Sequence, residues 1–162
     1  MNAEQKSFIE VVGAIAFADM KNSGVAASLT TAQAILESAW GKSELTKTGN
    51  ALFGIKATKD WKGKTLTRKT TEYEDGKKVQ VEAEFRAYDT WEDSVKDHSA
   101  FLKKYKRYAK VIGETDYKEA CNAVAAAGYA SDPEYAKKLI ELIETYELYN
   151  YDTKNTNTDD LG

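Results

Sequence analysis

Apolar residues follow a helical period through the first quarter of the chain. Over residues 3–22 they fall on one face, which predicts an amphipathic helix. Residues 30–41 are apolar on most positions, so we expect a second helix that is buried on nearly all sides. Thr30 and Gln33 have the spacing of a capping box at its start, and Gly41 is a typical stop just past a helix end.

The period changes from helical to alternating in the middle of the chain. Residues 65–74 are rich in threonine, which favours a strand, and Asp75-Gly76 is a strong turn signal for a hairpin. Residues 79–88 then alternate strictly between apolar and polar side chains. We therefore expect a two-stranded antiparallel hairpin with one wet face. A hairpin alone is marginally stable, so it should lean on the helical body and be able to move relative to it.

Helical patterns return after the hairpin. Thr90 is placed to cap a helix that runs to about residue 104, and an alanine-rich helix over residues 116–127 ends before Gly128. Asp132 and Pro133 have the order expected of a cap and a first helical position at the start of the last helix.

These patterns predict a mainly α (α+β) fold in which a helical lobe faces a small hairpin lobe across a groove. Such a groove suits a long, thin substrate. Residues 1–150 form one expected domain, and residues 151–162 are polar without periodicity, as is typical of a linker or disordered tail.

Composition excludes several classes of function. The net charge of −3 is spread along the chain and argues against a nucleic-acid partner. With one cysteine, Cys121, and one histidine, His98, an internal disulfide and a multi-histidine metal site are excluded, and we expect no metal or cofactor. No apolar run approaches the length of a membrane span, and the first residues lack the pattern of a secretory signal. Nothing in the sequence suggests an obligate assembly, so we expect a monomer without membrane insertion.

Glu37 is the one ionisable residue in the apolar helix over residues 30–41. Burial without a partner costs a carboxylate several kcal/mol, so such a group holds its proton to higher pH. A raised pKa is what a general acid needs near neutral pH. From the helix alone, however, a structural ion pair or a surface position is the better interpretation of Glu37.

Two further candidates come from the second half of the chain. Hydrolysis of a sugar bond commonly uses a second carboxyl group, and the hairpin carries five acids between which spacing does not choose: Glu72, Glu74, Asp75, Glu82 and Glu84. Most of them fit a solvated strand edge. Tyr129 stands in a tight loop between two helices, where its hydroxyl either projects into a cleft or plugs the helix ends.

Five stretches in the same order resemble glycoside hydrolase family 73, the peptidoglycan glucosaminidases of bacterial autolysins, flagellar rod-assembly hydrolases and phage lysins. The resemblance covers roughly residues 5–148. The stretches are residues 34–41, 52–57, 70–76, 85–88 and 128–136.

The resemblance implies a lysozyme-like fold and an endo-β-N-acetylglucosaminidase that cleaves the β-1,4 bond between N-acetylglucosamine and N-acetylmuramic acid. It places Glu37 on the family's general acid, Glu72 on its second carboxylate and Tyr129 on a tyrosine near the site. An inverting route with Glu72 as base is slightly preferred to a route in which the substrate's N-acetyl group is the nucleophile. The alternatives are a lytic transglycosylase or muramidase on the same fold, or a wall-binding module without catalysis.

Substrate contacts are expected from aromatic residues of the hairpin region, Trp61 and Tyr73, which can stack on sugars. Asn50, Phe53 and Tyr135 lie in or beside the matching stretches and complete the predicted substrate-binding set. Many relatives carry asparagine directly before Leu-Phe-Gly, where this chain has Ala51. Arg86, Asp97 and His98 are expected to be structural. The implied partner is the glycan strand of peptidoglycan, and the implied place of action is the bacterial cell wall, either outside the cell or after release by a phage.

Overall fold

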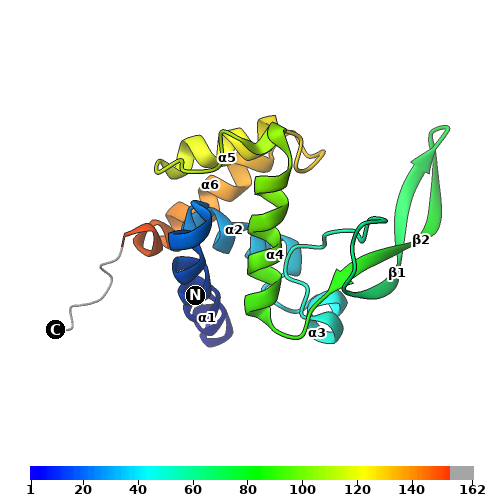
Figure 1. The fold of residues 1–162 in the computed structure, drawn as a ribbon, viewed down its shortest axis with the longest axis horizontal. Coiled ribbons are helices and arrows are strands. Elements are labelled where there is room, and N and C mark those ends of the chain that lie inside the picture. Colours follow the sequence, from blue (N-terminus) through cyan, green and yellow to red (C-terminus); the bar gives the residue numbers. More distant parts are fainter. Residues whose placement is uncertain (154–162) are drawn as a thin grey trace.

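The computed structural model describes residues 1–153, and Figure 1 shows them as a helical lobe from which a hairpin projects. The predicted tail lies outside the described residues from residue 154 onward. The elements in chain order are α1 (Ala3–Ser23), α2 (Ala27–Ser38), α3 (Glu44–Gly49), β1 (Lys64–Glu74), β2 (Lys77–Ala87), α4 (Trp91–Lys104), η1 (Lys106–Tyr108), α5 (Tyr117–Ala126), α6 (Tyr135–Thr145) and η2 (Leu148–Asp152).

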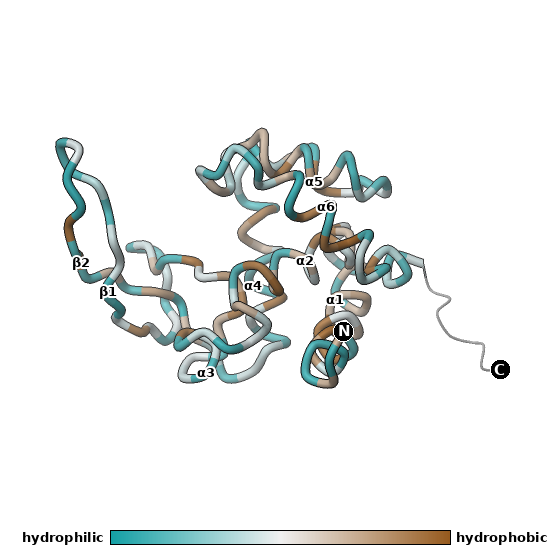
Figure 2. Tube along the Cα trace, turned by 180° about the vertical axis from the view of Figure 1, so that it is seen from behind, coloured by the Kyte–Doolittle hydropathy of each residue, from teal (hydrophilic) through white to brown (hydrophobic). Residues whose placement is uncertain are grey.

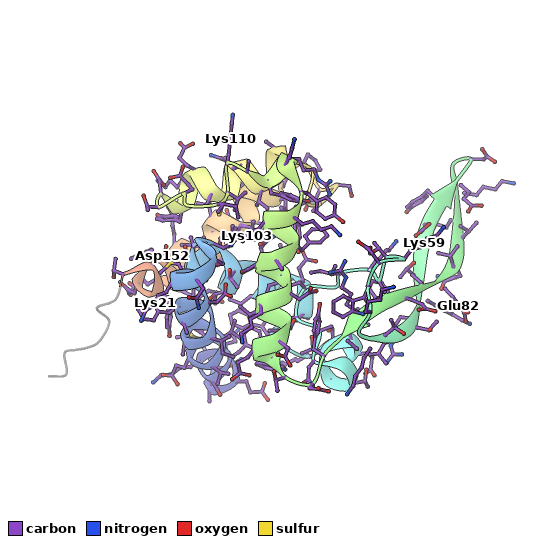
Figure 3. All side chains as sticks on the ribbon, viewed as in Figure 1. Lys21, Lys59, Glu82, Lys103, Lys110 and Asp152 are labelled. Atoms are coloured by element: carbon purple, nitrogen blue, oxygen red, sulfur yellow. The ribbon has the colours of Figure 1, made fainter. Side chains whose placement is uncertain are left out.

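Helix α2 forms the centre of the helical lobe, as its apolar sequence predicts. Every residue from Ala27 to Ile35 is buried, and the helix packs against α1, α6 and η2. Asp152 of η2, labelled in Figure 3, accepts hydrogen bonds from the backbone N–H and the hydroxyl of Ser28, at 2.8 and 2.6 Å. The folded body therefore extends two residues beyond the predicted boundary at residue 150.

The predicted limits of α2 need correction at both ends. The helix begins at Ala27, and its N-cap residue Ala26 makes no side-chain cap, so Thr30 lies within the helix and is buried. At the other end the helix stops at Ser38, because Ala39 and Trp40 both have positive φ, 52° and 61°. The capping box predicted for Thr30 and Gln33 is therefore wrong, and the amide of Gln33 is free for other partners.

The hairpin agrees with the prediction. Strands β1 and β2 pair antiparallel from Lys64↔Ala87 to Glu74↔Lys77. Asp75 and Gly76 form the turn with φ of 51° and 78°, the left-handed conformation that the tightest hairpin turns require. Inner and outer positions alternate, and Glu82, labelled in Figure 3, points away from the helical lobe. The hairpin is also largely hydrophilic, whereas apolar stretches gather in the helical lobe (Figure 2).

Polar and backbone bonds anchor the base of the hairpin. The backbone N–H of Arg86 donates to the carbonyl of Ile55 at 2.9 Å. The guanidinium of Arg86 donates to both carboxylate oxygens of Asp97 on α4, at 3.2 and 3.1 Å. The hydroxyl of Tyr88 donates to the same carboxylate at 2.5 Å. These bonds fit the structural role expected of Arg86 and Asp97. Nearer the turn, Glu72 is held to the body by an exposed ion pair with Lys56.

The last three helices also follow the sequence pattern. Thr90 caps α4 by accepting from the N–H of Asp93, and Asp116 caps α5 in the same way through Lys118. Helix α6 starts at Tyr135, later than predicted, because Asp132 accepts from Glu134 N–H in a separate turn before the helix. Among residues 1–153, no helix combines the length and apolar character that a membrane span needs.

Candidate active site

A pocket of about 280 Å³ lies where the end of α2 meets the loop between α5 and α6. Its walls come from four separate parts of the chain, which are the end of α2, the segment after α3, the α4–η1 region and the α5–α6 loop. The lining residues are Glu37, Phe53, Gly54, Ile55, Lys56, Thr58, Phe101, Arg107, Tyr108, Gly128, Tyr129 and Ala130.

Glu37 sits in the last turn of α2, where the buried helix opens to the pocket. Its neighbours Ile35 and Ser38 are buried, so the backbone that carries it is held in the core. The residue itself is accessible to solvent from the pocket. Its carboxyl is surrounded closely enough that burial raises its pKa, and a hydrogen bond from Tyr135 offsets part of that rise. Glu37 therefore combines access to a ligand with a pKa shifted toward that of a general acid.

A chain of hydrogen bonds leads from Glu37 into the core. The Tyr135 hydroxyl donates to Oε2 of Glu37 at 3.0 Å. The amide nitrogen of Gln33 donates to the same hydroxyl at 2.9 Å. The amide oxygen of Gln33 lies 2.8 Å from Nε2 of His98. The sequence reasoning missed Gln33 as a site residue, although a buried amide on an apolar helix always needs partners.

Tyr129 lines the same pocket. Its ring stacks on that of Tyr135, with centroids 5.8 Å apart and planes inclined by 10°. Burial raises the pKa of the Tyr129 hydroxyl far above its usual value, and the nearby charge of Glu37 adds to the rise. Tyr129 therefore remains a neutral phenol that can donate a hydrogen bond to a ligand in the pocket.

Glu72 stands outside the residues that line this pocket. It lies on the inner face of β1, and its Oε2 is 3.3 Å from Nζ of Lys56, which does line the pocket. The side chains of Lys56 and Glu72 keep 57% and 44% of their accessible surface, so the ion pair is weak and exchangeable. The structure thus brings Glu37 and Tyr129 into one pocket, whereas Glu72 lies outside it, paired with Lys56 of the pocket wall.

The residues expected to bind substrate lie in different surroundings. Phe53 lines the pocket and stacks on His98 at 4.0 Å, whereas Tyr135 is 2% exposed and lies behind the pocket. The amide of Asn50 donates to the carbonyls of Tyr88 and Asp89, at 3.1 Å each, and so holds the hairpin base.

The two remaining aromatic candidates for substrate binding, Trp61 and Tyr73, lie outside the pocket of Glu37, before and within the hairpin. Trp61 lies under the guanidinium of Arg86, 4.7 Å from the ring centroid. It lines a second pocket of about 180 Å³ that shares Phe101 with the pocket of Glu37. Tyr73, near the hairpin turn, is 68% exposed and is free to contact a ligand. The part of the chain that the structure describes holds no group of three or more side chains arranged for a metal ion.

Comparison with known proteins places this chain among enzymes that act on sugars. A family model described as mannosyl-glycoprotein endo-β-N-acetylglucosaminidase, the glucosaminidase family, matches residues 13–148. Exo-glucosaminidase LytG of Bacillus subtilis is 40% identical over 157 residues, which cover 94% of this chain and 55% of LytG. Peptidoglycan hydrolase FlgJ of Salmonella typhimurium is 36% identical over 148 residues, which cover 89% of this chain and 47% of FlgJ. The chain thus spans about half the length of the curated relatives it matches.

Solved structures agree with this comparison. The catalytic domain of the autolysin Auto from Listeria monocytogenes superimposes with a TM-score of 0.84 at 34% identity, covering 94% of this chain and 89% of that one. A glycoside hydrolase domain of Salmonella typhimurium FlgJ gives a TM-score of 0.74 at 37% identity, covering 88% and 97%. These matches confirm the predicted lysozyme-like arrangement of a helical lobe and a hairpin. Sequence and structure together show that this chain belongs to the glucosaminidase family, glycoside hydrolase family 73.

Proposed function

We propose that this chain hydrolyses peptidoglycan at the β-1,4 bond between N-acetylglucosamine and N-acetylmuramic acid, with Glu37 as general acid. The observation that carries the proposal is the carboxyl of Glu37, which faces the pocket with a raised pKa and is held by a hydrogen bond from Tyr135. The names of two relatives, a glucosaminidase and a peptidoglycan hydrolase, support the same class of substrate. Action at the bacterial cell wall follows from that substrate.

Protonated Glu37 donates its proton to the glycosidic oxygen as the bond to the leaving sugar breaks. Positive charge then develops on the sugar ring at the cleavage site. Tyr129, a neutral phenol beside Glu37, can hydrogen-bond the substrate in the same pocket. Since Glu37 is anchored in the core helix, its position relative to the pocket is fixed before substrate binds.

Glu72 is the proposed second carboxylate. An inverting enzyme needs its two carboxyl groups roughly 6.5–9.5 Å apart, with a water molecule between them. In the structure Glu72 is paired with Lys56, and both side chains are half-exposed, so little energy opposes their separation. The hairpin that carries Glu72 is anchored at its base through Arg86 and Asp97. The inverting route requires that Glu72 leave this ion pair and approach the substrate. In the competing route the substrate's N-acetyl group attacks, and Glu72 or Tyr129 steadies it.

Product analysis of digested peptidoglycan tests the proposal. We expect mass spectrometry to find new reducing ends of N-acetylglucosamine. Internal cleavage should give long fragments, and exo cleavage should release short fragments from a chain end. The name of LytG states exo cleavage for that relative. Rapid NMR of the fresh product should show the α-anomer if the inverting route holds.

The other outcomes contradict the proposal in distinct ways. Reducing ends of N-acetylmuramic acid indicate a muramidase, and anhydro ends indicate a lytic transglycosylase. No release of fragments by folded protein leaves the binding module as the function. A β-anomer with the expected reducing end keeps the bond assignment but replaces the inverting route with a retaining one.

A further inference from the structure

We propose that Tyr135, Gln33 and His98 form a positioning relay that keeps the acidic proton of Glu37 on Oε1, the carboxyl oxygen not bonded to Tyr135. The inference rests on the proposed role of Glu37 as general acid. It adds three residues that position the proton of Glu37 for that role. None of the three contacts substrate in this proposal. They act through Glu37, by fixing which of its two oxygens carries the proton.

The relay is buried along its whole length. Gln33 and His98 have no accessible surface, and Tyr135 is 2% exposed. Its three links measure 3.0, 2.9 and 2.8 Å and join α6, α2 and α4, so it ties together three of the helices around the pocket. Hydrogen bonds are stronger in a low-dielectric core than in water, so three consecutive buried links hold their side chains in a defined arrangement.

The direction of the hydrogen bonds follows from His98. Its Nδ1 is buried and has no partner among the described residues. A buried N–H without a partner is rarer and costlier than a bare nitrogen lone pair, so the ring proton belongs on Nε2. Burial also lowers the pKa of His98 to about 3, which keeps the ring neutral with a single N–H. Nε2–H therefore donates to the amide oxygen of Gln33.

Each further link is then determined by the one before it. With its oxygen facing His98, the Gln33 amide presents its N–H to the Tyr135 oxygen. The Tyr135 hydroxyl hydrogen can only point onward, to Oε2 of Glu37. Oε2 is thereby an acceptor, and the proton that Glu37 takes up must reside on Oε1. Oε1 has no hydrogen-bond partner within residues 1–153, so that proton is available to a glycosidic oxygen.

The charged and titratable groups around Glu37 come from every wall of the pocket. Lys56 lies on the segment after α3, Arg107 and Tyr108 lie on η1, and Tyr129 lies on the α5–α6 loop. Tyr135, on α6, lies behind the pocket and donates to Glu37, and Glu72 lies outside the pocket, paired with Lys56. Of these groups, Tyr135 alone hydrogen-bonds the Glu37 carboxyl within the described residues. Its loss should therefore alter the titration of Glu37.

Tyr135→Phe tests the first link, because it removes the hydroxyl and keeps the ring that stacks on Tyr129. The hydrogen bond favours the charged form of Glu37, so its loss raises the pKa of that carboxyl. Protonated Glu37 is the active form of an acid, so the basic limb of the kcat/KM profile should move up by about half a pH unit to one unit. We expect kcat at the optimum to fall about 10- to 100-fold and KM to stay within about twofold, because the proton is no longer confined to Oε1.

Gln33→Met tests the second link in a double-mutant cycle with Tyr135→Phe. Gln33→Met alone should move the basic limb in the same direction by a smaller amount, and it should add no further shift in the Tyr135→Phe background. Ser28→Ala is the matched control. It removes a buried hydroxyl bond to Asp152 at the other end of the same helix, at 2.6 Å, and should leave the profile in place.

Three results would overturn the relay. If the basic limb of the kcat/KM pH profile does not move in Tyr135→Phe, the first link is rejected. If Gln33→Met shifts that limb equally in the wild type and in the Tyr135→Phe variant, the second link is rejected. A large rise in KM with nearly normal kcat makes Tyr135 a substrate-binding residue, as the sequence alone suggests. If Gln33→Met does not fold, Tyr135→Phe decides by itself. Glu37→Gln, assayed alongside, separates the two proposals. If Glu37→Gln retains activity, the assignment of Glu37 as general acid fails. If Glu37→Gln is inactive and the basic limb of the pH profile does not move in Tyr135→Phe, only the relay is rejected.

Discussion

At the scale of single residues, Glu37 shows what one sequence can and cannot predict. Its apolar helix alone favoured a structural ion pair or a surface position, whereas burial in the folded protein raises the pKa of its carboxyl. Its hydrogen-bond partners could not be predicted, because Tyr135 is 98 residues away along the chain and the Gln33–His98 contact spans 65 residues. A local pattern suggested that Gln33 caps a helix, whereas packing makes it a link between distant side chains. The spacing of residues along the chain contains no information on such pairs.

His98 makes a second prediction at this scale, on stability against pH. Its pKa is about 3 in the folded protein and about 6.5 when unfolded, so the unfolded chain binds more protons between these values. The free energy of unfolding should therefore fall as the pH drops from about 6.5, by up to about 1.4 kcal/mol per pH unit. Glu37 and Asp152, whose pKa values are raised, oppose part of this loss because they take up protons more readily when folded.

Urea unfolding at a series of pH values between 7 and 4.5 measures this slope. We expect His98→Gln, which cannot titrate, to show a shallower slope than the wild type, whatever its stability at pH 7. Equal slopes in the two proteins would show that His98 is not the group responsible.

At the scale of elements, the hairpin was the easiest part to predict and α2 the hardest. Asp75-Gly76 and the strict alternation after it determine the turn and the register of β1 and β2. The start of α2 has no such signal, because its N-cap is Ala26 and burial alone holds the helix there. Helix limits set by tertiary packing leave little trace in local sequence.

The attachment of the hairpin to α4 can be tested through Asp97. Arg86 is 7% exposed, and Asp97 receives two hydrogen bonds from it and one from Tyr88. Asp97→Asn should lower the free energy of unfolding by about 2–4 kcal/mol, because it leaves a buried guanidinium without its counter-charge. Glu4→Gln is a control for an exposed pair, since Glu4 and Lys42 keep 78% and 63% of their side-chain surface. It should change stability by less than about 1 kcal/mol. Similar small effects of both substitutions in chemical denaturation would contradict the anchoring role of Asp97.

At the scale of the whole molecule, the two proposed carboxylates differ in how firmly they are held. Glu37 is carried by α2, whose residues Ala27–Ile35 are buried in the helical lobe, and Glu72 is carried by the hairpin, whose base is held to α4. Figure 1 shows α2 within the helical lobe and the hairpin projecting from it. The sequence predicted both lobes and the match to the glucosaminidase family confirms their arrangement. The ion pair of Glu72 with Lys56 was not predictable, because it depends on how the hairpin leans against the segment after α3. Under the proposed function, a firmly held acid and a weakly held second carboxylate suit a substrate as long as a glycan strand.

The central claim, that Glu37 is the general acid, is tested most directly by kcat/KM of Glu37→Gln on purified peptidoglycan, with thermal unfolding as the check on folding. Glutamine keeps the size of the side chain and cannot donate the proton that a glycosidic oxygen needs. We predict a fall of about 10³-fold or more, with an unfolding temperature equal to or above that of the wild type, because a partly buried acid has been removed. A folded Glu37→Gln variant that cleaves peptidoglycan within about threefold of the wild-type rate would contradict the claim.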